Sequence, residues 1–247
     1  MKLTILGSGT CVPTVDRASP ANYLEIGKTK ILVDCGAGTL RQIVKAKLDY
    51  QNLDYVFLTH FHPDHISDII ALIHAMSWIP NYERKKDLVL VGPVGLKIFF
   101  ESYFKPIEGV GEPKTYKIVI LEIENKLSFN NFSVECIKTI HADIGVAYKF
   151  IENEKSMVIS GDCDYEEKLI EFCKNTDLLL LECSYPNESK MKGHLIPSEC
   201  GAIAMESKAK KMIITHLYPI DKEIRLKQTK EIFKNTILAK DLMEVEI

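Results

Sequence analysis

The stretch THFHPDH at residues 59–65 places three histidines and one aspartate within seven residues, directly after the apolar run DYVFL. Four of the seven histidines in the chain lie between positions 60 and 74. A polar loop that caps a strand would explain one lone histidine, because histidine is commonly found at intermediate burial. The local density of titratable side chains instead indicates a site built at the end of a buried strand.

The spacing of these residues predicts how their side chains converge. In an extended segment, His60 and His62 project to the same side. Pro63 ends the strand and can open a helix, because the N–H that proline lacks has no partner in a first helical turn. Asp64 and His65 would then lie in that first turn, aimed back at the same point. Imidazole nitrogen and carboxylate oxygen are ligands for zinc and related metals, so the pattern predicts a site for two metal ions.

Three further candidate ligands lie where other predicted strands end. His141 follows the run VECIKTI, Asp162 follows SMVISG, and His216 follows KMIIT. Sites in α/β proteins gather at strand ends, which favours a common role for the three. Each also has a simpler alternative. A histidine there could bond a backbone carbonyl, and Asp162 could cap the helix predicted from CDYEEKLIEF.

Length and composition indicate one α/β domain over residues 1–247. With 46% hydrophobic and 26% charged residues, the chain can bury one substantial core. Short apolar runs typical of strands intermix with helical patterns along the whole length, the longest of them at 65–79 and 223–236. Residues 116–160 contain strand after strand, with turn signals between them. We therefore expect mixed sheets, including antiparallel meanders, with helices on their outer faces.

Charge, cysteines and hydropathy set further bounds. The formal net charge of −3 gives no overall attraction to nucleic acid, so such a contact would need a local basic patch. The seven cysteines are scattered without a CxxC pair, which favours reduced core thiols. No run approaches about 18 consecutive apolar residues, and the start MKLTILGSGT lacks the pattern of a signal peptide. We expect a cytoplasmic protein that makes no membrane contact.

The hexapeptide HFHPDH resembles the HxHxDH signature of the metallo-β-lactamase superfamily, and the later histidine, aspartate and histidine occur in that superfamily's order. The resemblance spans most of the chain and implies a four-layer αββα sandwich with two metals at one edge. The metal ligands that it implies are His60, His62 and His141 for one ion, Asp64, His65 and His216 for the other, and Asp162 between them. The nucleophile would be a bridging water or hydroxide that the metals acidify. Asp34 matches an aspartate that supports such a site from beneath.

Within this superfamily, the chain is most similar to ribonuclease Z and related small phosphodiesterases. The segments that carry this similarity are GSGTCVPTVDRASPANYL, DCGAGTLRQ and GHLIPSECGAIA. The last of them implies that His194 acts on the phosphate or on the leaving group rather than on a metal; its alternative is a solvated loop residue. Asp64 and His194 are the residues that we expect to take part in catalysis.

Two departures from ribonuclease Z bear on the substrate. The arm with which that family grips transfer RNA has no room here, because only 20 residues separate His141 from Asp162 and a predicted hairpin uses them. The final motif THLYP also lacks the serine-rich, arginine-containing continuation of the transfer-RNA enzymes. Both departures favour a small phosphodiester over RNA.

The leading hypothesis is a di-metal phosphodiesterase that acts on small or cyclic phosphodiesters. Three alternatives stay open: a ribonuclease Z-type transfer-RNA 3′ endonuclease without the arm, an arylsulfatase or other ester hydrolase, and a metal-binding carrier that turns nothing over. Zinc is the expected metal, although manganese and iron accept the same ligands. Arg17 and Tyr218 are weaker candidates for contact with a substrate phosphate. The family resemblance also suggests a homodimer.

Overall fold

Two mixed β-sheets form the centre of the computed structural model, which describes residues 1–220 and 222–247. The first sheet contains, in spatial order, β14 (Met243–Glu246), β1 (Lys2–Gly7), β2 (Ala21–Ile26), β3 (Thr29–Val33), β4 (Tyr55–Phe57), β5 (Leu88–Gly92) and β6 (Ile118–Glu122). The second contains β13 (Thr236–Leu238), β12 (Met212–Thr215), β11 (Leu178–Glu182), β10 (Lys155–Ile159), β9 (Val146–Glu152), β8 (Ser133–Lys138) and β7 (Lys126–Ser128). The strands β3 to β6 and β10 to β13 pair in parallel, whereas β7 to β10 form the predicted antiparallel meander.

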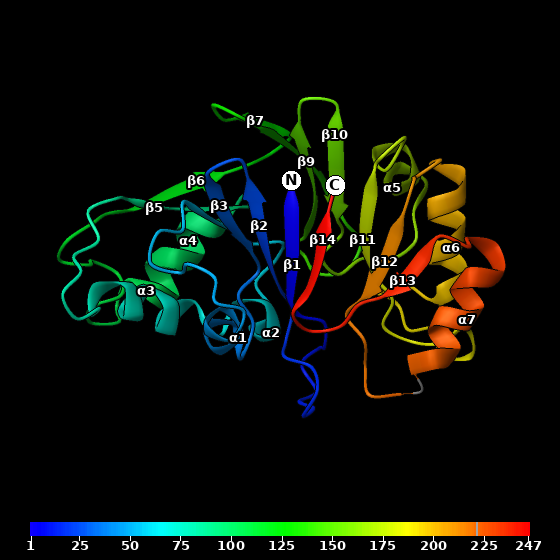
Figure 1. The fold of residues 1–247 in the computed structure, drawn as a ribbon, viewed down its shortest axis with the longest axis horizontal. Helices are drawn as coiled ribbons and strands as arrows, with labels where there is room; N and C mark the ends of the chain where they lie inside the picture. The colour runs from blue at the N-terminus through cyan, green and yellow to red at the C-terminus, as the bar shows by residue number, and fades with distance from the viewer. Residues whose placement is uncertain (221) are drawn as a thin grey trace.

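Helices cover the outer face of each sheet (Figure 1). Those beside the first sheet are α1 (Thr39–Lys45), α2 (Pro63–Ile66), α3 (Ile69–Ser77), α4 (Leu96–Phe99) and the π-helical turn η1 (Phe100–Phe104). Those beside the second are α5 (Glu167–Phe172), the 3₁₀ turn η2 (Asn187–Ser189), α6 (Pro197–Glu206) and α7 (Lys222–Ile232). The layers follow the expected αββα order. No helix in the described part of the chain is long and apolar enough to cross a membrane.

Three apolar clusters hold these layers together. One lies between the two sheets and is centred on aromatic side chains, with Phe57 packed edge-on against Tyr148 and Phe150 at centroid distances of 5.4 and 5.2 Å. The second joins the first sheet to its helices, where α3 buries Leu72 and Met76. The third joins the second sheet to α5 and α6. Burial on both faces explains why β11 begins with four consecutive leucines before it ends at Glu182.

Several predicted helices have different bounds in the structure. The pattern at 65–79 divides into α2 and α3, and Asp68 between them receives the N–H of Leu40 on its side chain. The pattern at 223–236 ends at Ile232, because the chain turns there into β13. The short strands β7 and β13 were not predicted, since three residues are too few to show a strand periodicity.

Parallel pairing brings the ends of several strands to one edge of the sandwich. The register of β3 with β4 sets Val33 opposite Phe57, so the residues that follow each strand are neighbours. In the second sheet, β10, β11 and β12 run in parallel, and their carboxyl ends meet at the same edge. The predicted ligands that follow β4, β10 and β12 are therefore gathered at one place.

Candidate metal centre

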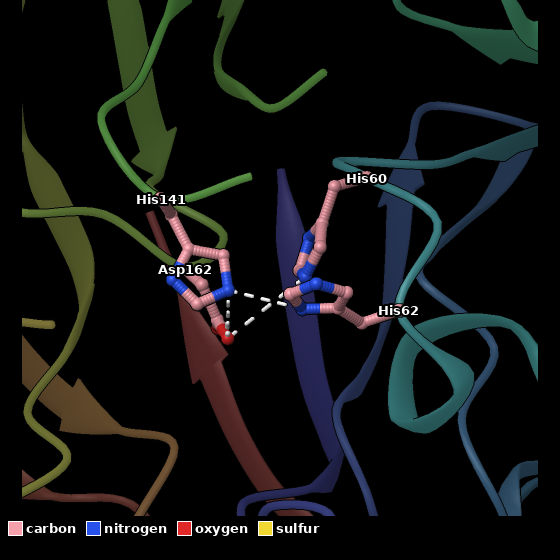
Figure 2. Close-up of side chains that lie close together, drawn as sticks. All are labelled: His60, His62, His141 and Asp162. Atoms are coloured by element: carbon pink, nitrogen blue, oxygen red, sulfur yellow. Dashed lines mark hydrogen bonds and ion pairs between the residues drawn. The ribbon is translucent and has the colours of Figure 1, made fainter. Parts of the chain in front are cut away.

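The histidines and aspartates predicted as ligands converge between the two sheets. His60 follows β4 and forms a bridge with Gly145, whereas His62 precedes α2, which begins at Pro63 as predicted. His60 and His62 come from the first sheet, and they face His141 and Asp162, which come from the second (Figure 2). The candidate ligand atoms of these four residues all lie within 4.8 Å of one another.

A second group lies on the other side of Asp162. The ligand atoms of Asp64, His65 and His216 likewise lie within 4.8 Å of one another. Asp162 Oδ1 is 3.3 Å from His65 Nε2 and 3.2 Å from His216 Nε2. Its other oxygen, Oδ2, is 3.4 Å from His141 Nε2. Asp162 therefore lies between the two groups, and it does not cap a helix, because α5 begins at Glu167, after an N-cap at Glu166.

Several buried polar atoms of these residues have no hydrogen-bond partner in the described part of the chain, and they indicate whether a cation would fit between them. His60 Nε2, His65 Nε2, His216 Nε2 and Asp162 Oδ1 are buried, and among the described residues none of the four has a hydrogen-bond partner. A buried polar atom without a partner costs free energy, and four of them converge here. Imidazole nitrogen and carboxylate oxygen are also the donors that divalent metals prefer. The residues present therefore fit a metal centre.

Asp34 orients two of these histidines from beneath. Its carboxylate accepts hydrogen bonds from the Thr59 N–H at 2.8 Å and from the Thr59 hydroxyl, and Oδ2 is 2.8 Å from His65 Nδ1. The Thr59 hydroxyl is in turn 3.1 Å from His60 Nδ1. Each ring thus has its Nδ1 engaged and its Nε2 turned toward the centre, which is the arrangement that supports metal-binding histidines.

Different partners orient the histidines of the second sheet. His141 Nδ1 is 2.7 Å from the carbonyl of Gly193. His216 Nδ1 is 2.9 Å from the Ser184 hydroxyl, which donates to Glu182 Oε2. No sequence pattern pointed to Ser184, and Glu182 was visible only as the polar end of an apolar strand.

Burial and mutual charge set the protonation of the cluster. Burial, together with the neighbouring His65, lowers the pKa of His60 well below its ordinary value. Burial alone would raise the pKa of Asp162, but His216 and His65 lower it well below the usual range. The centre therefore contains an ionised carboxylate and at least one neutral imidazole, the states in which these groups bind metals.

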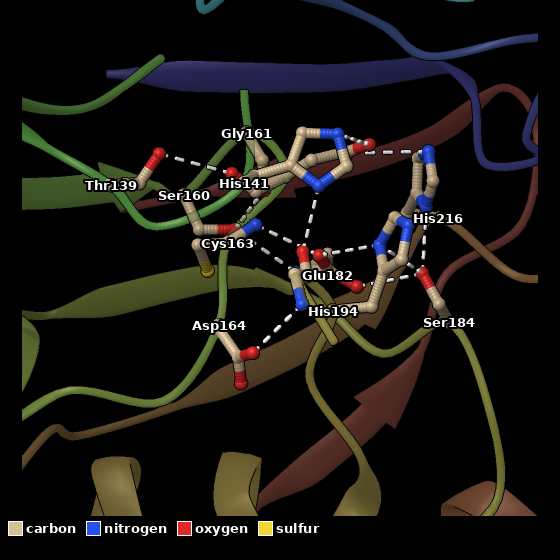
Figure 3. A network of polar contacts seen from close by, with 12 residues as sticks. Thr139, His141, Ser160, Gly161, Cys163, Asp164, Glu182, Ser184, His194 and His216 are labelled. Carbon is tan, nitrogen blue, oxygen red and sulfur yellow. Dashed lines mark hydrogen bonds and ion pairs between the residues drawn. The ribbon is translucent and has the colours of Figure 1, made fainter. Parts of the chain in front are cut away.

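His194 lies beside this cluster and is held by Glu182 (Figure 3). Its Nδ1 is 2.9 Å from Glu182 Oε1, and its ring centroid is 4.7 Å from that of His141 and 5.6 Å from that of His216. Glu182 is fixed in turn by the backbone N–H of Cys163 at 2.8 Å. Burial alone would lower the pKa of His194, but the hydrogen bond and charge of Glu182 raise it above the usual histidine value. A protonated imidazole is thus favoured at the border of the centre.

The two weaker candidates for substrate contact lie in different surroundings. Arg17 is buried, and its Nη1 donates to the Ser8 hydroxyl and to the carbonyl of Ala239. The expectation that Arg17 contacts substrate is therefore corrected, because this guanidinium ties a loop to the core. Tyr218 lies half-buried near the centre, with its ring centroid 6.1 Å from that of His216. It stacks on Tyr185, which the sequence did not single out.

The αββα sandwich and its cluster of histidines and aspartates define the class of metallo-β-lactamase-fold hydrolases. The chain belongs to the family described as anti-Pycsar protein Apyc1, whose model matches residues 1–235.

Individual relatives agree with this class. The chain is 28% identical over 307 aligned positions to ribonuclease Z of Archaeoglobus fulgidus, covering 100% of this chain and 97% of the relative. It is 28% identical over 246 positions to the probable metallo-hydrolase YhfI of Bacillus subtilis, covering 96% of each. The crystal structure of YhfI has a TM-score of 0.87 at 26% identity, covering 100% of this chain and 99% of that one. The short form of human tRNase Z shares the fold, with a TM-score of 0.84 at 23% identity and coverage of 100% and 99%.

Proposed function

We propose that this protein is a metal-dependent phosphodiesterase that cleaves small or cyclic phosphodiesters. The residues that would hold one ion are His60, His62 and His141, those for a second ion are Asp64, His65 and His216, and Asp162 would serve both. Zinc is the metal expected at such nitrogen and oxygen donors. Bound metal ions would acidify a water molecule for attack on phosphorus and would offset negative charge on the phosphoryl oxygens.

The observation that carries the proposal is the position of His194. Its Nδ1 faces Glu182 at 2.9 Å, so the opposite nitrogen is the one left for a substrate. A protonated imidazole that donates to a carboxylate through Nδ1 can give the proton on Nε2 to a leaving oxygen or hydrogen-bond a phosphoryl oxygen. Both kinds of assistance promote the cleavage of a phosphodiester, because charge develops on the phosphoryl oxygens and on the departing oxygen, and protonation matters most when the departing group is an alkoxide.

A ribonuclease Z-type endonuclease is the second candidate, and the similarity to the Archaeoglobus enzyme over the whole chain favours it. Two observations favour a small substrate instead. The alignment with that enzyme runs over 307 positions, longer than this chain, so the relative carries segments that are absent here. The residues between His141 and Asp162 are also largely used by the hairpin of β9 and β10.

The proposal also covers the cellular compartment and the oligomeric state of the protein. All seven cysteines are free, which supports a reducing compartment such as the cytoplasm. The homodimer suggested by the family resemblance stays a prediction, which light scattering of the purified protein tests.

The test begins with protein purified without chelator. Bound metal is quantified, and the same preparation is assayed with bis-p-nitrophenyl phosphate, p-nitrophenyl sulfate and 2′,3′-cyclic nucleotides, and with a transfer-RNA precursor. Turnover of the phosphodiesters without cleavage of the RNA supports the proposal. Turnover of the sulfate alone would overturn the substrate class, and stoichiometric binding without turnover would indicate a carrier.

The His194→Ala variant distinguishes a catalytic role of His194 from a role in metal binding. Turnover should fall by about 10²-fold or more, the usual contribution of a general acid, while metal content stays unchanged. His74→Ala is the matched control, because His74 is exposed on α3 and lies beside Trp78, away from the centre. Loss of metal in His194→Ala would make His194 a ligand rather than a catalytic residue.

A further inference from the structure

Tyr185 and Tyr218 form a stacked pair because of the register between two parallel strands. Glu182 at the end of β11 pairs with Thr215 at the end of β12. Each tyrosine follows its strand residue by three positions, so the two rings leave neighbouring strand ends together. Their centroids are 4.7 Å apart and their planes differ by 21°. Both side chains are half-buried, so they are not part of an apolar core cluster.

This tyrosine pair, Tyr185 and Tyr218, borders the candidate metal centre. The centroid of His194 is 6.0 Å from Tyr185 and 6.3 Å from Tyr218, and in both contacts the rings meet edge to face. Tyr218 has the same relation to His216 at 6.1 Å. The residue proposed to act on phosphate is therefore adjacent to a flat aromatic surface that the hydrolysis itself does not use.

Arg225 holds the backbone beneath both rings. This arginine of α7 is fully buried, and its Nη1 donates to the carbonyl of Ser184, the residue before Tyr185. Its Nη2 donates to the carbonyls of Tyr218 at 2.7 Å and Ile220 at 3.1 Å. One guanidinium thus ties together the two loops that carry the pair. A surface fixed in this way loses little conformational freedom when a ligand stacks on it.

We propose that the tyrosine pair is the subsite for the base of a nucleoside phosphodiester. The proposal rests on the phosphodiesterase function and assigns two residues of this chain to the recognition of the base. In a nucleotide, a sugar joins the phosphate to the base. When the phosphate lies at His194, the base is therefore within reach of the neighbouring tyrosine pair. Stacking on an aromatic side chain accepts every base, because every base has a π-face. The subsite therefore selects nucleoside esters over simple alkyl esters, with little preference among bases.

Two substrates with the same leaving group test the subsite. Thymidine 5′-(p-nitrophenyl phosphate) and methyl p-nitrophenyl phosphate both release p-nitrophenol, but only the first carries a base. Tyr185→Ala and Tyr218→Ala should lower kcat/KM for the thymidine ester by about tenfold, the scale of one lost base stack, and leave the methyl ester within about twofold. Tyr185→Phe and Tyr218→Phe retain the stacking ring and should retain the activity.

Tyr103→Ala is the matched control, because Tyr103 in η1 is 65% exposed and stacks on Phe99 at the end of α4, outside the proposed subsite. It should change neither substrate. An equal loss for both esters in the tyrosine-pair variants would overturn the subsite and make the pair a support for His194. Unchanged kinetics for both esters would overturn it as well.

Calorimetric titration of the metal-loaded protein separates the subsite from the proposed function. The wild type should bind thymidine 5′-monophosphate about tenfold more tightly than methyl phosphate, and Tyr218→Ala should abolish the difference. If this difference in affinity is found but the protein hydrolyses neither ester, the phosphodiesterase function is contradicted and the subsite is supported. Equal affinity of the wild type for the two phosphates would contradict the proposed base subsite but would not affect the phosphodiesterase proposal.

Discussion

The carboxylate of Asp34 contacts His65 at Nδ1, at 2.8 Å, and the Nε2 of the same ring faces Asp162 at 3.3 Å. A neutral imidazole whose Nδ1–H donates to a carboxylate presents an unprotonated Nε2, the form that binds a metal, on its opposite side. Asp34 also receives the N–H and hydroxyl of Thr59. One buried carboxylate therefore sets the direction of a ring that could bind a metal and fixes the loop on which His60 lies.

Asp34→Asn should weaken metal binding without removing any proposed ligand. The amide keeps the size of the carboxylate but no longer favours the proton on Nδ1 of His65, so Nε2 is less available. Loss of such a supporting group typically costs 10- to 100-fold in metal affinity, which a chelator competition with zinc measures. Asp143→Asn is the control, because Asp143 is exposed. Equal zinc affinity in Asp34→Asn and the wild type would contradict a positioning role.

Glu182→Gln should move the pH dependence of turnover toward acid. Glu182 raises the pKa of His194 against the effect of burial. A general acid works while it is protonated, so activity is present below this pKa and is lost as the pH rises through it. Removing the charge of Glu182 lowers the pKa, and the alkaline limb of kcat/KM should begin at a lower pH than in the wild type.

The matched control for this change is Glu206→Gln, at an exposed position at the end of α6. Its pH profile should overlay that of the wild type. An alkaline limb that stays in place in Glu182→Gln would show that a group other than His194 controls it.

Arg225→Ala should lower both stability and the recognition of nucleoside esters. The substitution leaves the buried carbonyl of Ser184 and the part-buried carbonyl of Tyr218 without this donor, and the penalty is about 1–3 kcal/mol of unfolding free energy for a fully buried group. Arg84 offers a matched comparison, because it is also fully buried and donates to the carbonyls of Gln51, Leu53 and Asp87.

The two arginines differ in position relative to the candidate centre. The carbonyls that accept hydrogen bonds from Arg84 precede β4 and β5, at the strand ends opposite the site. Urea unfolding should show a similar loss for Arg84→Ala and Arg225→Ala, whereas only Arg225→Ala should raise KM for the thymidine ester. A similar rise in KM for both variants would mean that general loosening, rather than the tyrosine pair, controls KM.

Much of the fold could be predicted because its signals are local. Apolar runs such as LVLVG and LLLLE mark buried strands, and the expected αββα layers are confirmed. The convergence of the histidines and aspartates was also predictable, since each follows a strand. Their role as metal ligands remains a prediction.

The surroundings of the site could not be predicted in the same way. Ser184 and Tyr185 acquire their roles from the register of β11 with β12, which no local pattern encodes. Arg17 appeared in a motif with a catalytic resemblance, yet its role depends on Ala239, which is 222 positions away in sequence. The partners of a side chain across the sheets are set by long-range packing, so composition and spacing alone did not reveal them.

Metal removal should destabilise the protein measurably. The buried Nε2 atoms of His60, His65 and His216 and Oδ1 of Asp162 have no hydrogen-bond partner among the described residues, and a bound cation would satisfy them. A ligand that binds only the folded state stabilises it by about 2.7 kcal/mol at a concentration one hundred times its Kd. Chelator-treated protein should therefore melt at a lower temperature, and its Tm should rise with added zinc. His216→Ala should lose most of this increase, whereas His74→Ala should keep it. A Tm that does not respond to zinc in the wild type would mean that the cluster holds no metal and that its unpaired atoms are tolerated for another reason.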